Sequence, residues 1–139
     1  EHGKKQRLQQ LLVEFEAPII IFSNEKRVVE LLHKIIEKWG YNPIVYHGSK
    51  TQPQREAAVD GFKNKKYDIL IATDLAGRGL HVDGVSLVIN FDAPKNIREF
   101  VHRTGRTGRA GKKGVAITFL TSHDEGIFYD LNDYLEKNQ

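Results

Sequence analysis

Cysteine is absent from the 139-residue sequence, and this absence excludes disulfide bonds and metal sites built from thiolates. Long apolar runs are missing too, since no stretch approaches the ~20 apolar residues that a membrane-spanning helix needs. The first residues, Glu1 to Lys5, lack the apolar segment of a secretory signal. These absences predict a soluble domain with no membrane contact. The lack of cysteine also suits an intracellular, reducing compartment without establishing it.

A strong excess of either charge is also missing. The 21 lysines and arginines against 18 aspartates and glutamates leave a net charge of +3, too little to identify a nucleic-acid-binding protein. The distribution is more informative, because seven cationic or titratable side chains fall within one short stretch. They are Arg98, His102, Arg103, Arg106, Arg109, Lys112 and Lys113. A solvated surface explains most such clusters. The residues between the charged ones must therefore show whether this cluster is a binding site.

The length and composition fit one globular domain, residues 1–139, with 40% hydrophobic and 28% charged residues. Short apolar runs alternate with helical patterns, which is typical of a parallel sheet covered by helices. The runs are almost unbroken rather than alternating, so we expect strands that are buried on both faces. The expected strands are Ile19–Phe22, Pro43–Tyr46, Ile69–Thr73, Leu87–Phe91 and Val115–Leu120.

Helices are expected over Lys4–Phe15 and from about residues 24, 52, 97 and 123. Gly40 falls where a helix favours a left-handed end, and Thr51 with Gln54 forms a capping-box pattern. Right-handed crossovers then give an open, mostly parallel α/β sheet with helices on both faces. Because such sheets bind ligands at the carboxyl ends of their strands, that edge is where we expect function.

The most informative segment runs from His102 to Gly111, in the order His-Arg-Thr-Gly-Arg-Thr-Gly-Arg-Ala-Gly. A glycine at every third position ends the preceding helix and lets the backbone approach a ligand closely. The arginines supply planar guanidinium groups, which bind phosphate through two hydrogen bonds. A basic surface loop is the alternative, and the regular spacing disfavours it. The segment therefore predicts a phosphate site.

This segment resembles motif VI of the DEAD-box RNA helicases, and further segments resemble other motifs of that family in the same order. They are Ile19–Asn24 (motif IV), Gln52–Arg55 (the Gln-x-x-Arg motif) and Ala72–Leu80 (motif V). The resemblance implies a RecA-like fold and the second of the two RecA-like domains of an ATP-dependent RNA helicase. The form of motif V and the last strand are most similar to the splicing-associated Prp28 type, which implies a nuclear location; without that likeness the cytoplasm is equally open.

The resemblance makes Arg106 and Arg109 the arginine fingers that face the γ-phosphate of ATP. A fixed guanidinium charge stabilises the charge that spreads over phosphoryl oxygens in the transition state. His102 is implied to couple the nucleotide site to the other domain through a hydrogen bond, and a histidine that only completes the helix end is the alternative. The family usually has an aspartate for the ATP ribose where this chain has His81. Asp83 could replace it only if the loop runs differently.

RNA contacts are implied for Arg55, Thr73 and the backbone of Gly48. A guanidinium, a hydroxyl and a glycine amide can all bind the sugar-phosphate chain, and none of them reads base identity. Taken alone, Thr73 is better explained as a β-branched residue that simply ends a strand. Its place in motif V favours the role in RNA binding instead. The resemblance therefore implies RNA binding that is independent of sequence.

Two parts of an ATPase are missing from the chain. No stretch fits the phosphate loop Gly-x-x-x-x-Gly-Lys-[Ser/Thr], and no Asp-Glu-Ala-Asp run is present to hold magnesium. The family carries both in the N-terminal RecA-like domain, so we expect this chain to be an excised fragment that is inactive alone. ATP with Mg²⁺ is the implied cofactor, with no metal ligand in this chain. The implied partners are RNA, the N-terminal domain and spliceosomal proteins.

A scaffold is the alternative to an enzyme. In that interpretation the parent protein has weakened ATP turnover, as His81 hints, and the domain binds RNA or protein within a ribonucleoprotein. Retention of both Arg106 and Arg109 favours the enzyme, because a scaffold has no use for two guanidinium groups at finger spacing.

Overall fold

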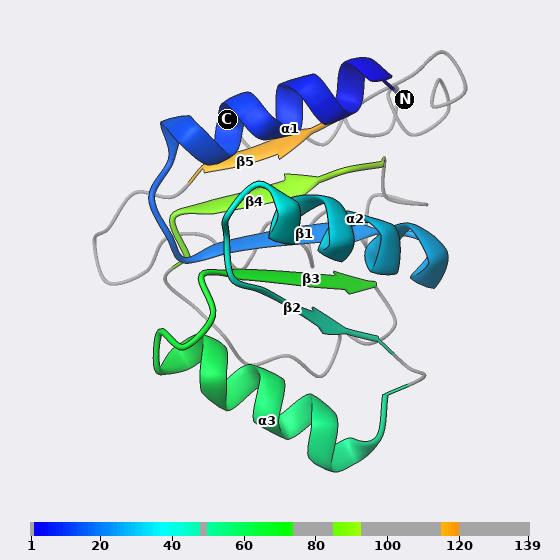
Figure 1. Cartoon of the computed structure of the whole chain (residues 1–139), viewed down its shortest axis with the longest axis vertical. Coiled ribbons are helices and arrows are strands. Elements are labelled where there is room, and N and C mark those ends of the chain that lie inside the picture. Colours follow the sequence, from blue (N-terminus) through cyan, green and yellow to red (C-terminus); the bar gives the residue numbers. More distant parts are fainter. Residues whose placement is uncertain (1, 48–49, 74–84, 93–114, 120–139) are drawn as a thin grey trace, which may run out of the picture.

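The computed structural model describes residues 2–47, 50–73, 85–92 and 115–119. In these ranges the elements are α1 (His2–Glu14), β1 (Ile19–Ser23), α2 (Lys26–Lys38), β2 (Pro43–Tyr46), α3 (Gln52–Lys63), β3 (Ile69–Thr73), β4 (Leu87–Asn90) and β5 (Val115–Thr118). The strands form one parallel sheet in the order β2-β3-β1-β4-β5 (Figure 1). The expected open α/β fold is confirmed.

The central strands are buried on both faces, as their unbroken apolar sequences predict. Every residue of β1, β3 and β4 is buried. The bounds of β2 and β3 match the apolar runs, whereas β1 extends by one residue to Ser23 and β4 ends at Asn90. Phe91 still donates its N–H to the carbonyl of Phe22 at 2.9 Å. The apolar run is therefore one residue longer than β4, and that residue still makes a hydrogen bond to the neighbouring strand.

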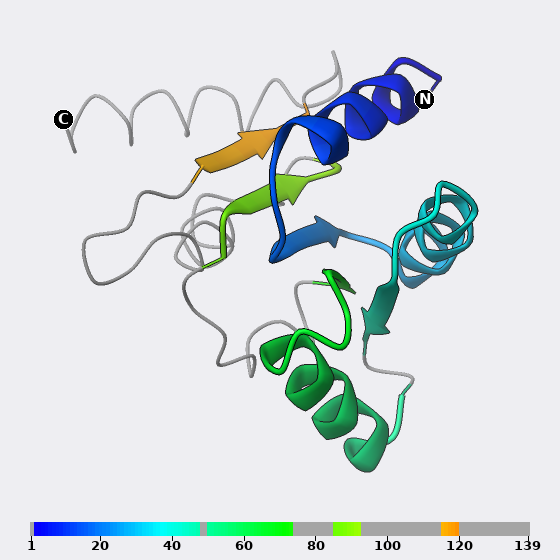
Figure 2. The ribbon, with the colours of Figure 1, turned by 60° about the vertical axis from the view of Figure 1, so that its left-hand side comes forward.

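Successive residues of β1 face opposite layers of the molecule, because side chains alternate along a strand. Ile19 and Ile21 pack with apolar side chains of α1 and α2, while Ile20 and Phe22 pack with those of α3. Figure 2 shows α1 and α2 on one side of the sheet and α3 on the other. The expectation of helices on both faces is therefore confirmed.

Local signals set the bounds of the helices. Helix α2 ends at Lys38 with Trp39 as its C-cap, and Gly40 then takes a φ of 96°, the left-handed end that its position predicts. Thr51 caps α3, since its hydroxyl accepts the Gln54 N–H at 3.2 Å and the Gln54 side chain accepts the Thr51 N–H at 2.9 Å. The helices expected from about residues 97 and 123 lie outside the described ranges. Within those ranges, no helix has the length and apolar character to cross a bilayer.

Candidate functional site

The carboxyl ends of the parallel strands meet at one edge of the sheet, where the strand arrows of Figure 1 point. Thr73 ends β3 and is only 6% exposed, and it pairs in register with Ser23 at the end of β1. Arg55 lies in the first turn of α3, on the connection that follows the neighbouring strand β2. Two of the predicted site residues therefore belong to neighbouring segments of this edge.

Asp92 holds the ends of β1 and β4 together. Its Oδ2 accepts the Ser23 hydroxyl at 2.6 Å, and its Oδ1 accepts the Asn24 N–H at 2.8 Å. Ser23 is fully buried, so its hydroxyl depends on this partner rather than on water. The carboxylate therefore fixes the start of the β1–α2 connection. Sequence reasoning placed the function at this edge and gave Asp92 no role.

Asn90 is a second buried polar residue at the same edge, and it is fully buried. Its Nδ2 donates to the hydroxyl of Thr118 at 2.8 Å, which ties β4 to β5. Within the described residues its Oδ1 has no hydrogen-bond partner. A buried amide oxygen of this kind normally has a donor. Sequence reasoning did not single out Asn90. The signal that could have found it is an asparagine at the end of an otherwise apolar strand.

The end of β2 carries an ionic cluster. His47 is 4% exposed, and its Nε2 lies 2.9 Å from Oε1 of Glu30 on α2. The Lys50 ammonium lies 3.4 Å from the same oxygen. The hydrogen bond with His47, and then the charge of Lys50, hold the pKa of the Glu30 carboxyl below its ordinary value, against the opposing effect of burial.

The same cluster closes a turn, because the Lys50 N–H donates to the His47 carbonyl at 3.1 Å. His47 and Lys50 therefore stand fixed on the two sides of Gly48, itself outside the described residues. Sequence reasoning missed Glu30, because a glutamate within a helix gives no sign of a buried histidine beside it.

The side chain of Arg55 is half-buried, and its Nη2 donates to Oε1 of Gln52 at 2.9 Å. This hydrogen bond joins the first and last residues of the Gln-x-x-Arg segment on one turn of α3. Arg55 also lines a concave site of about 310 Å³ together with Tyr46, the last residue of β2. The guanidinium is therefore held at the surface beside the strand end, in reach of a ligand.

The remaining predicted site residues lie outside the described ranges. They are Gly48, His81, Asp83, His102, Arg106 and Arg109. In the described part of the chain, no group of three or more histidines and carboxylates could hold a metal ion.

The helicase conserved C-terminal domain family matches residues 3–111. The chain belongs to this family. The helicase domain is 51% identical over 140 residues to the pre-mRNA-splicing ATP-dependent RNA helicase PRP28 of Chaetomium globosum, covering 99% of this chain and 20% of that protein. It therefore spans about a fifth of that relative's length.

Two solved structures are similar to the helicase domain in both sequence and fold. The RNA helicase Prp28 of Chaetomium thermophilum, in a crystal structure with ADP, matches with a TM-score of 0.91 and 51% identity, over 97% of this chain and 34% of that one. The E. coli DEAD-box protein SrmB matches with a TM-score of 0.88 and 34% identity, over 96% of this chain and 79% of that one. The predicted DEAD-box membership and RecA-like fold are confirmed.

Proposed function

We propose that this helicase domain is the second RecA-like domain of an ATP-dependent DEAD-box RNA helicase of the Prp28 type, acting on RNA in nuclear pre-mRNA splicing. The observation that carries the proposal is 51% identity to a splicing helicase across 99% of the chain. The N-terminal RecA-like domain that the family resemblance implies is the expected partner of this edge of the sheet.

RNA is gripped through the carboxyl edge in this proposal. Arg55 offers a guanidinium beside the end of β2, and Thr73 offers a hydroxyl at the end of the adjacent strand β3. The cluster of Glu30, His47 and Lys50 fixes the residues that flank Gly48 in the sequence, and the Gly48 backbone is the third proposed contact. Each contact is to sugar or phosphate, so binding is independent of base sequence.

The chemistry of the edge fits ATP with its magnesium ion on the other domain. Both oxygens of Asp92 accept hydrogen bonds, from Ser23 and from the Asn24 backbone, so this carboxylate acts as a structural link between the ends of β1 and β4. Bound ATP supplies the phosphoanhydride bond whose hydrolysis drives the cycle. In this proposal Arg106 and Arg109 neutralise charge on the γ-phosphoryl oxygens, and His102 couples the nucleotide site to the N-terminal domain through a hydrogen bond. His81 occupies the sequence position at which the family usually has an aspartate for the ribose, and Asp83 could take that role only if the loop runs differently.

The test is substitution of Arg106 or Arg109 by lysine in the full-length protein. Lysine keeps the charge and loses the planar fork, so it cannot contact two phosphoryl oxygens in one geometry. Arginine fingers contribute roughly 10³–10⁵ in rate, whereas an exposed charge pair contributes only about 0–1 kcal/mol. We expect most RNA-stimulated ATP turnover to be lost while thermal unfolding stays unchanged. Near-normal turnover in both variants would contradict the finger role and would favour a solvated basic loop.

A further inference from the structure

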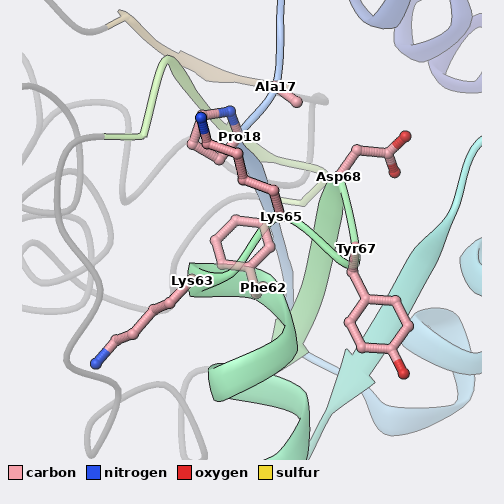
Figure 3. Close-up of a pocket in the computed structure, with 7 residues that line it drawn as sticks. All are labelled: Ala17, Pro18, Phe62, Lys63, Lys65, Tyr67 and Asp68. Atoms are coloured by element: carbon pink, nitrogen blue, oxygen red, sulfur yellow. The ribbon is translucent and has the colours of Figure 1, made fainter.

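A pocket lies at the amino-terminal edge of the sheet, opposite the edge that carries Thr73. Its volume is about 430 Å³, and it lies between the segment before β1 and the segment that joins α3 to β3 (Figure 3). The lining residues are Ala17, Pro18, Phe62, Lys63, Lys65, Tyr67 and Asp68. The proposed ATP and RNA contacts use none of these residues, so the pocket has no task in that mechanism.

The apolar part of the pocket is held in place by the core. Phe62 is 2% exposed and belongs to the cluster between α3 and the sheet. Tyr67 packs against the end of α3 at Gly61, where a Cβ atom would come within 2.5 Å of the tyrosine ring. Only glycine leaves room for the ring at that distance. The wall and the floor of the pocket are therefore fixed by packing, as a preformed ligand site requires.

Lys65 has a backbone conformation that normally selects glycine. Its φ is 65°, in the left-handed region, and it occupies the first position after the helix cap. The Lys66 N–H donates to the Gly61 carbonyl at 2.7 Å, and the Lys65 N–H donates to the Phe62 carbonyl at 3.2 Å. This is the hydrogen-bond pattern of a helix end that glycine usually completes. Lysine holds this conformation at a steric cost that glycine would not have.

The rim of the pocket is positively charged. Residues 63–66 contain the lysines Lys63, Lys65 and Lys66, and Figure 3 shows Phe62 between the first two. The one acidic lining residue, Asp68, already accepts the Asn42 N–H at 3.0 Å. Ammonium groups around an apolar floor complement a ligand that carries both carboxylates and an apolar side chain.

A peptide fits these features better than RNA does. Single-stranded RNA binds by stacking its bases on exposed aromatic faces. Phe62 is almost completely buried, and the Lys66 ammonium lies over the Tyr67 ring, 5.5 Å from its centre. Phe62 therefore offers no free face to a base, and one face of the Tyr67 ring is already occupied by the Lys66 ammonium. A single peptide side chain that enters the pocket above Phe62 does not need a free aromatic face.

We propose that this pocket binds an acidic peptide segment of a partner protein. One aromatic or aliphatic side chain of the peptide enters between Pro18 and Tyr67, and the neighbouring carboxylates contact Lys63 and Lys65. The interaction goes beyond the proposed helicase function, because it uses the edge of the sheet that faces away from the candidate ATP and RNA contacts.

The experiment measures fluorescence anisotropy of a labelled peptide, a phenylalanine flanked by glutamates, with the full-length helicase. We expect binding that weakens when alanine replaces the phenylalanine of the peptide. In the protein, Lys65→Glu should weaken binding by roughly tenfold, because it replaces an attraction at the rim with a repulsion. The matched control is Lys34→Glu, an exposed lysine on α2 outside the pocket, which should leave the affinity unchanged.

Lys65→Gly separates binding from folding. Glycine relieves the left-handed conformation, so this variant should unfold at the same or a higher temperature than wild type and still bind the peptide more weakly. RNA-stimulated ATPase should be unchanged in both Lys65 variants. The proposal is overturned by equal binding of the alanine peptide, by unchanged affinity of both Lys65 variants, or by displacement of the peptide by single-stranded RNA. The last result would assign the binding to the RNA surface.

Discussion

Removal of the Asp92 carboxylate should destabilise the domain markedly. The Asp92→Ala substitution deletes two hydrogen bonds to an ionised acceptor, each of which contributes roughly 1.5–3 kcal/mol. Water can replace the bond to the part-buried Asn24 N–H, but it cannot reach the Ser23 hydroxyl, which is fully buried. We therefore expect a loss of about 3 kcal/mol in the free energy of unfolding, which lowers the midpoint of thermal unfolding by roughly 10 °C in a domain of this size.

Thermal unfolding of the chain, followed by circular dichroism, is the assay. Asp60→Ala is the matched control, since Asp60 is an exposed carboxylate on α3, and it should change stability by no more than about 0.5 kcal/mol. A double-mutant cycle with Ser23→Ala measures the pair directly, and we expect the combined variant to be less destabilised than the sum of the two. Equal midpoints of thermal unfolding for Asp92→Ala and Asp60→Ala would contradict a stabilising link between β1 and β4. Additive effects of Asp92→Ala and Ser23→Ala in the double-mutant cycle would contradict it too.

Two further predictions concern other charged groups of the site. Because the folded-state pKa of Glu30 is lowered, its contribution to stability is complete above the ordinary glutamate pKa and is lost as pH falls through the folded-state value. Chemical unfolding at a series of pH values should therefore show a smaller acid-side loss in Glu30→Gln than in wild type; equal losses would contradict this. In the full-length protein, His81→Asp should tighten ATP binding by about 0.5–1.5 kcal/mol, one net hydrogen bond. Calorimetric titration with ATP and with 2′-deoxy-ATP tests this, and unchanged affinities would mean that the position does not face the ribose.

The elements of the fold were predictable where one local signal decided them. The unbroken apolar runs predicted the bounds of β2 and β3, because strands buried on both faces tolerate few polar residues. Gly40 and the Thr51 capping box predicted a helix end and a helix start, because each depends on residues within one turn.

The side-chain pairs of the candidate site were not predictable in the same way. Ser23 and Asp92 lie 69 residues apart, and they meet because β4 pairs with β1 rather than with β3, its predecessor in the chain. Glu30 and His47 lie 17 residues apart, on helix α2 and directly after strand β2, and whether the two meet depends on how the helix packs against the sheet. Residue types indicated the functional edge, whereas the choice of partners depends on the order of the strands.

That order has a consequence for how the domain is made. Strand β1 stands between β3 and β4, so a ribosome that has released residues 1–73 has supplied β1, β2 and β3 but not the second neighbour of β1. Until residues 87–90 emerge, the segment Ile19-Ile20-Ile21-Phe22 has one unpaired backbone edge and no charge. Such an edge is a template for pairing with other chains. Products of premature termination between β3 and β4 should therefore aggregate.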